Sequence, residues 1–223
     1  MTDGEAARAA ILRAIKSALS GEPARELPAP APVFPAQPAD PVAMAESFRK
    51  ELEALKGETI FVATPEAMPR ALGLLLSQRG FNTAAVQNST RVSAALAHVA
   101  GDRFFQAAGA SSERIEAADC GIIEADALLA DTGSIIAIFK NRGERLLPYL
   151  PRVCIAIADV SMLRPHMDDE ALKHIYGAAR DKSRGEGVII TGPSRSADIE
   201  KVLVLGAHGP AEVIVLIAGI QQA

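Results

Sequence analysis

The stretch of the chain best suited to chemistry lies near the C-terminus, at residues 188–200. A β-branched apolar run stops there at a Gly-Pro pair, and the small polar residues that follow predict the start of a helix. Such a turn presents backbone N–H groups, hydroxyls and a guanidinium at the positive end of a helix, which suits a phosphate or a carboxylate. The candidate anion-binding residues of this turn are Gly192, Ser194, Arg195, Ser196 and Asp198.

Arg195 also has a purely structural interpretation, as an exposed residue paired with Asp198 or Glu200. Exposed ion pairs stabilise a fold by only about 0.2–1 kcal/mol. The position of Arg195 directly after the Gly-Pro-Ser strand end favours contact with a ligand. Asp198 is better placed to orient Arg195 or to cap a helix than to act as an acid–base group.

Two further segments could complete the site: Thr132-Gly133-Ser134 and the glycine-flanked His208. The first could cradle an anion through backbone N–H groups, or it could be an ordinary tight turn between two strands. His208 fits a ligand-contacting loop nearly as well as a structural one. Ser194, Asp198 and His208 do not indicate a hydrolase, because the chain has no Gly-x-Ser-x-Gly elbow.

The two cysteines, Cys120 and Cys154, lie singly within apolar runs and predict buried free thiols in a reducing compartment. Neither has a second Cys or His at the spacing of metal ligands, and His98, His166 and His174 share no spacing. We therefore expect no metal, no iron–sulfur cluster and no other cofactor held by this chain.

From residue 42 onward, strand-like runs alternate with helical segments, which predicts an α/β domain with a mostly parallel sheet covered by helices. The expected strands are 59–63, 83–86, 103–106, 120–124, 134–139, 153–158, 187–191 and 212–218, and the expected helices are 42–56, 64–79, 90–100 and 168–180. The short gap between 120–124 and 134–139 favours some antiparallel pairing there. Ligands of open α/β sheets bind beyond the carboxyl ends of strands, where residues 126–131 and 191–198 are expected.

The N-terminal part has a different composition. Residues 4–20 predict an amphipathic helix, and seven of the fourteen prolines lie within residues 22–41, as in a semi-extended linker. We expect three parts: an N-terminal helix at 1–21, a Pro-rich linker at 22–41 and the α/β domain at 42–223. The helix could dock on its own domain, on a second copy or on a partner.

Charge and hydropathy narrow the class of partner. The net charge of −4, the pI near 5.6 and the dispersed basic residues argue against a nucleic-acid or anionic-membrane surface. No apolar run approaches the length of about 18 residues needed to span a membrane. Arg13 and Lys16 interrupt the first apolar run, so no secretory signal is evident and a cytosolic location is expected.

Four motifs follow one another along the chain, at residues 130–134, 145–151, 192–200 and 206–210. In their order they resemble the motifs of the LUD domain, the domain of lactate utilization proteins B and C. The resemblance covers residues 42–219 and implies a fold similar to that of ribose-5-phosphate isomerase and the CoA-transferases. With its two isolated cysteines the chain resembles the C subunits of the family, whereas the B subunits carry ferredoxin-like cysteine clusters.

The resemblance implies a role in a system that oxidises L-lactate to pyruvate together with iron–sulfur subunits. In that role the chain would lack a redox cofactor of its own and bind a small carboxylate or phosphate, or the partner subunits. The alternative is an autonomous isomerase, or an enzyme similar to the CoA- and acyl-transferases, acting on a phosphorylated or CoA-linked substrate. CoA-transferases of this fold group use a glutamate nucleophile, and Glu124 ends a predicted strand, although a carboxylate there is usually just solvated.

Overall fold

The computed structural model describes residues 3–19, 40–97, 99, 104–167, 186–197, 203–205 and 209–221 of the 223-residue chain. Its contacts group into two units, residues 1–35 and 36–223. Within the first unit, helix α1 (Asp3–Leu19) forms where a helix is predicted. The predicted linker lies outside the described residues except for Asp40 and Pro41, which begin helix α2.

The second unit is built on a six-stranded sheet whose strands all run parallel, in the order β1-β12-β7-β4-β2-β3. Each of the six strands begins within one residue of its predicted start and ends within one residue of its predicted end. The α/β class and the parallel sheet are therefore confirmed. The strands are β1 (Glu58–Val62), β2 (Ala84–Val86), β3 (Phe104–Gln106), β4 (Cys120–Glu124), β7 (Val153–Asp159) and β12 (Glu212–Ala218).

A second, mixed sheet has the order β8-β5-β6-β9. Strand β6 pairs antiparallel with β5 and β9, and β5 pairs parallel with β8. The antiparallel pairing found in this region joins β5 to β6. The two strands predicted to lie close together, β4 and β6, belong to different sheets, because the chain leaves the parallel sheet after Glu124. The strands are β5 (Ala127–Leu129), β6 (Ser134–Phe139), β8 (Leu163–Arg164) and β9 (Glu186–Ile190).

Short polar side chains begin most of the helices. Asp40 accepts a hydrogen bond from Ala43 N at the start of α2, and Ser89 accepts one from Val92 N at the start of α4. Helix α4 is shorter than predicted, and the helix expected at 168–180 lies outside the described residues. The helical segments are α2 (Pro41–Ala54), η1 (Pro65–Ala67), α3 (Met68–Gln78), α4 (Thr90–Ala95), α5 (Ser112–Glu116), α6 (Arg142–Arg145) and η2 (Val160–Met162).

The prediction that a helix begins after Gly192 is wrong. Residues Arg195–Ala197 instead form strand β10, which pairs antiparallel with β11 (Leu203–Leu205). Just before β10, the N–H of Ser194 donates to the carbonyl oxygen of Pro210 at 2.9 Å. This hydrogen bond holds the backbone extended. Because it joins residues far apart in the sequence, local helix propensity cannot predict it.

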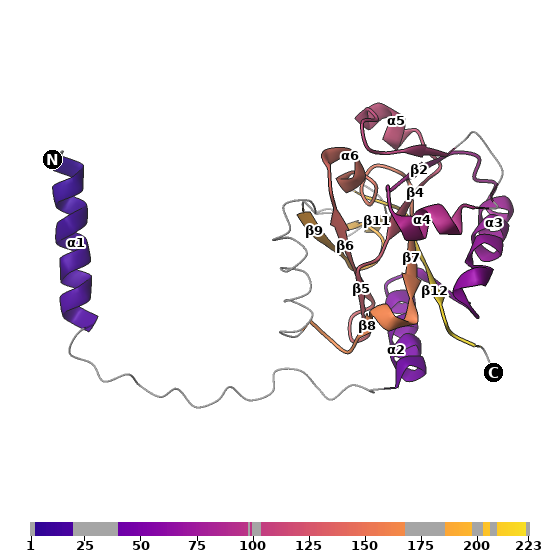
Figure 1. Ribbon diagram of the computed structural model, residues 1–223, viewed down its shortest axis with the longest axis horizontal. Helices are drawn as coiled ribbons and strands as arrows, with labels where there is room; N and C mark the ends of the chain where they lie inside the picture. Colours follow the sequence, from indigo (N-terminus) through magenta and orange to yellow (C-terminus); the bar gives the residue numbers. More distant parts are fainter. Residues whose placement is uncertain are drawn as a thin grey trace. The chain divides into compact units, whose positions relative to one another are not determined.

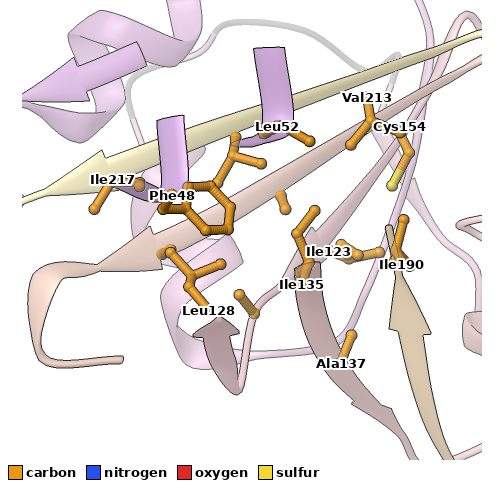
Figure 2. Close-up of a cluster of buried hydrophobic side chains, with 14 of the residues drawn as sticks. Phe48, Leu52, Ile123, Leu128, Ile135, Ala137, Cys154, Ile190, Val213 and Ile217 are labelled. Carbon is orange, nitrogen blue, oxygen red and sulfur yellow. The ribbon is translucent and has the colours of Figure 1, made fainter. Parts of the chain in front are cut away.

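The parallel sheet separates two apolar layers, as the alternation of side chains along β12 shows. Val215 and Ile217 point into one layer, and Ile214 and Leu216 point into the other. The mixed sheet and α2 cover the first layer, and α3 and α4 cover the second (Figure 1). In the first layer the α2 side chains meet residues of both sheets (Figure 2): Phe48, Leu52, Ile123, Leu128, Ile135, Cys154, Ile190 and Ile217.

This packing yields a prediction about truncation. Deleting residues 1–38 should leave a folded domain with an unchanged melting temperature, since the buried core of the second unit begins at Met44. Deleting residues 1–41 should cost about 0.5–2 kcal/mol more, because it removes the Asp40 cap of α2. Thermal melts of both proteins beside the full chain would test this. A large loss of stability in the shorter deletion would show that the N-terminal helix belongs to the core.

Candidate functional site

The carboxyl ends of the parallel strands enclose a pocket of about 280 Å³. Glu124, Asp159 and Ala218, which end β4, β7 and β12, form one side of it. The first turns of the helices that follow β1 and β2 form the other side. These turns contribute Pro65, Met68, Thr90 and Arg91.

The strand order explains why a pocket forms here. Strands β2 and β4 are neighbours in the sheet, but the chain leaves them in opposite directions. After β2 it adds β3 on the far side of β2, and after β4 it adds β7 on the far side of β4. Neighbouring strands whose connections diverge in this way leave a crevice, which is the usual ligand position in open α/β sheets. Arg91 follows β2 and Glu124 ends β4, so both flank this switch point.

Arg91 and Glu124 form the charged centre of the pocket. Arg91 Nε donates to Glu124 Oε1 at 3.1 Å, and the two side chains are 38% and 26% exposed. The backbone N–H of Glu124 donates to Gln87 Oε1 at 2.7 Å, and Gln87 Nε2 donates to the carbonyl oxygen of Ile138 at 3.1 Å. The buried Gln87 thus fixes the backbone at the end of β4, and the ion pair fixes the carboxylate.

The rest of the pocket is small and mostly apolar. Its lining includes the small residues Ala94, Ala95 and Ala218, which leaves room for a compact ligand. Asp159 also faces the pocket, but its Oδ1 accepts hydrogen bonds from the N–H and the hydroxyl of Ser161, at 2.9 and 2.6 Å. Asp159 therefore caps η2, and the Arg91–Glu124 pair is the group suited to hold a polar ligand.

Two of the sequence-predicted segments do meet, beside the C-terminal end of α2. Ser134 Oγ lies 2.8 Å from Thr132 Oγ1 and 2.9 Å from Thr191 Oγ1. Ser134 is only 3% exposed, so this chain of hydroxyls joins the Thr-Gly-Ser turn to the end of β9. The structure thus brings the Thr132–Ser134 segment next to the Gly192 turn.

The glycines of these two segments face helix α2. Gly133 and Gly192 have left-handed φ values of 62° and 81°. A Cβ on Gly133 would lie 2.5 Å from the backbone nitrogen of Leu52, and one on Gly192 would lie 2.9 Å from Leu55 Cβ. Close approach of α2 accounts for both glycines. Their role in anion binding stays a prediction.

The end of the Gly-Pro-Ser motif meets the segment before β12. Besides the hydrogen bond from Ser194 N to Pro210, Ala211 N donates to the carbonyl oxygen of Arg152, just before β7. This contact therefore lies at the amino ends of β7 and β12, the opposite edge of the sheet from the pocket. Arg195 and Ser196 are described only as backbone of β10, and Asp198 and His208 lie outside the described residues.

Arg91 and Asp159 were missed by the sequence analysis. Their positions in the sequence indicate a site, because both follow predicted strands. Arg91 comes after the predicted strand 83–86 and the cap of the next predicted helix, and Asp159 directly follows the predicted strand 153–158. Applying the carboxyl-end rule to every predicted strand would have selected both, together with Glu124.

The cysteines lie apart from the pocket. Burial, with a smaller effect of the Asp119 carboxylate, raises the pKa of Cys120 to about 12, and burial alone raises the pKa of Cys154 to about 12. Among the described residues no group of His, Cys, Asp and Glu could hold a metal ion. Likewise, no helix in the described part of the chain is long and apolar enough to cross a membrane.

Fold and pocket together define an α/β protein with a pocket at the carboxyl ends of the strands of a parallel sheet. The family model of the LUD domain matches residues 45–218, and the chain belongs to this family. A crystal structure of a DUF162 family protein from Deinococcus radiodurans has the same fold, with a TM-score of 0.59 and 13% identity, over 81% of this chain and 99% of that one.

Curated relatives match a shorter part of the chain. Lactate utilization protein C of Halalkalibacterium halodurans is 39% identical over 99 residues, which are 44% of this chain and 43% of the relative. The protein of the same name from Shouchella clausii is 38% identical over 113 residues, which are 48% of this chain and 47% of the relative. The matched region thus spans less than half the length of each of these relatives.

Proposed function

We propose that this chain is a cytosolic component of a lactate utilization system, working beside iron–sulfur subunits that oxidise L-lactate to pyruvate. The observation that carries the proposal is membership of the LUD domain family over residues 45–218. The similarity to two proteins named lactate utilization protein C supports it. Cys120 and Cys154 are buried as free thiols, which fits a chain whose redox cofactors are held by other subunits.

Within this role the chain binds a small anion, either a carboxylate or a phosphate. The proposed anion site is the turn from Gly192 to Asp198, with the Thr132–Ser134 segment and His208 beside it. The hydrogen bond between Ser134 and Thr191 supports placing the Thr132–Ser134 segment next to the Gly192 turn. The parallel sheet with its carboxyl-edge pocket is also compatible with a fold similar to that of ribose-5-phosphate isomerase and the CoA-transferases.

The test is genetic and biochemical. Deleting the gene in the organism that encodes the chain should abolish growth on L-lactate, while growth on glucose should be unaffected. Affinity purification of the tagged chain from lactate-grown cells should recover proteins with cysteine-cluster motifs and an iron–sulfur absorption spectrum. Normal growth of the deletion strain on L-lactate would overturn the proposal.

The purified chain should itself be colourless and contain neither iron nor zinc in stoichiometric amount. At neutral pH both thiols should be inert to a disulfide reagent until the protein unfolds, because a pKa near 12 leaves almost no thiolate. Metal analysis of a tag-free preparation and thiol titration with and without denaturant would check both expectations. One zinc per chain, or rapid reaction of either native thiol, would contradict them.

The second candidate function is that of an autonomous isomerase, or of an enzyme similar to the CoA- and acyl-transferases. The observation that favours it is the carboxylate of Glu124 beside Arg91 in the pocket. Steady turnover of a phosphorylated or CoA-linked substrate by the isolated chain, lost in Glu124→Gln and kept in the exposed control Glu116→Gln, would establish it.

A further inference from the structure

The geometry points to the carboxyl-edge pocket as a binding site for a short 2-hydroxy carboxylate. In this assignment Arg91 holds the ligand carboxylate, and Glu124 accepts a hydrogen bond from the 2-hydroxyl. The choice of ligand rests on the function proposed above. The pocket and its ion pair are independent of that proposal. This site lies at the opposite edge of the sheet from the Gly192 turn.

The guanidinium of Arg91 has unused donors. Among the described residues its one hydrogen bond is the Nε contact with Glu124. A guanidinium carries five N–H donors in a planar fork, so the edge formed by its two terminal nitrogens can still take a carboxylate in bidentate geometry. The contact with Glu124 also fixes the plane of the fork, which lowers the entropic cost of ordering it around a ligand.

Glu124 has unused acceptors. An ionised carboxylate accepts at two oxygens, and the described contacts of this side chain engage only Oε1. Because Arg91 and Glu124 are already 3.1 Å apart, a ligand that contacts both must carry its acceptor and its donor on neighbouring atoms. A carboxylate with a hydroxyl on the adjacent carbon meets that requirement, whereas a simple fatty acid supplies no donor.

The size of the pocket and its walls select a short ligand. The volume of about 280 Å³ lies just below the range of roughly 300–1,000 Å³ that is typical of pockets for drug-sized ligands. The apolar lining, which includes Ala94, Ala95 and Ala218, can pack against a short alkyl group but provides no hydrogen-bond partner for a sugar chain. A small acid with one methyl or ethyl group fits these walls.

The charges of the pocket allow an anion to bind. Arg91 balances Glu124, and the serine donors that engage Asp159 hold its carboxylate in the η2 cap. The first turn of helix α3 also borders the pocket, and its positive end offsets part of the remaining negative charge. Because a ligand carboxylate has to share Arg91 with Glu124, we expect modest affinity.

The experiment is calorimetric titration of the full chain with L-lactate and with propionate, which lacks the 2-hydroxyl. The wild-type chain should bind L-lactate about tenfold more tightly than propionate. Arg91→Ala should weaken L-lactate binding by about tenfold to a hundredfold, and Glu124→Ala should bind the two acids equally well. The surface variant Arg70→Ala should behave as the wild type, since Arg70 lies on α3 outside the pocket lining.

A second variant guards against misfolding of the first ones. Ala94→Leu places a larger side chain at the exposed rim of the pocket without altering either charged group, and it should also abolish L-lactate binding. Thermal melts of all variants would identify any that unfold. Equal L-lactate affinity in the wild type, Arg91→Ala and Ala94→Leu would overturn the assignment, as would a wild-type chain that binds neither acid.

The two proposals fail separately. A deletion strain that cannot grow on L-lactate, combined with a purified chain that binds no 2-hydroxy acid, would leave the cellular role intact and reject the pocket assignment. A deletion strain that grows normally on L-lactate, combined with binding that depends on Arg91, would reject the cellular role and keep the pocket.

Discussion

Replacing Gly133 with alanine is expected to lower the free energy of unfolding by about 2–5 kcal/mol. Two costs add. The left-handed φ of 62° is unfavourable for any residue with a Cβ, and the new methyl would lie 2.5 Å from the backbone nitrogen of Leu52. Because the clash is with helix backbone, no side-chain rotation can relieve it, and α2 must move. A loss of this size is a large part of the roughly 5–15 kcal/mol that stabilises a typical domain.

Substitutions at two other glycines separate the conformational cost from the cost of the clash. Gly109 has a φ of 80° with open space where a Cβ would lie, so Gly109→Ala should show only the conformational cost of about 1–2 kcal/mol. Gly73 lies inside α3, where a Cβ would meet only Val99 Cγ2 at an ordinary contact distance of 3.7 Å, so Gly73→Ala should be neutral or stabilising by up to about 1 kcal/mol. Denaturant unfolding of the three variants measures the differences. Equal losses at Gly133 and Gly109 would contradict the tight packing of α2.

The second large effect is expected in anion binding at the Gly192 turn. Arg195→Ala should weaken the binding of phosphate or acetate by about tenfold to a hundredfold, because it removes a charge-assisted contact. The melting temperature should barely change if Arg195 serves a ligand. Arg195→Lys should recover only part of the affinity, since a point charge cannot reproduce the bidentate geometry of a guanidinium.

Calorimetric titrations and thermal melts of these variants beside Arg70→Ala would decide the role of Arg195. Strand β10 replaces the predicted helix and its positive end, and the N–H of Ser194 is bonded to Pro210, so the guanidinium of Arg195 is expected to be the main donor to an anion. Equal affinity in all variants, or a large loss of stability in Arg195→Ala, would assign Arg195 a structural role.

Most local elements could be predicted from the sequence, because their signals are local. Short apolar runs predict the six strands of the parallel sheet, and Ser89 predicts the start of α4 through a cap that the structure shows. The turn after Gly192 shows the limit of such reasoning. Small polar residues suit the start of a helix and a hairpin equally, and a hydrogen bond to Pro210, sixteen residues further along the chain, decides between them.

The sequence by itself determined the α/β class, the parallel sheet, the family and the free state of two buried thiols, since hydrophobic periodicity, turn residues and motif order are all local. Only the tertiary structure decided which residues share a site. Arg91 and Glu124 lie 33 positions apart and meet because β2 and β4 are neighbours in the sheet. The order of strands depends on which apolar faces pack best across the whole domain, and periodicity along one strand carries no information about its neighbours.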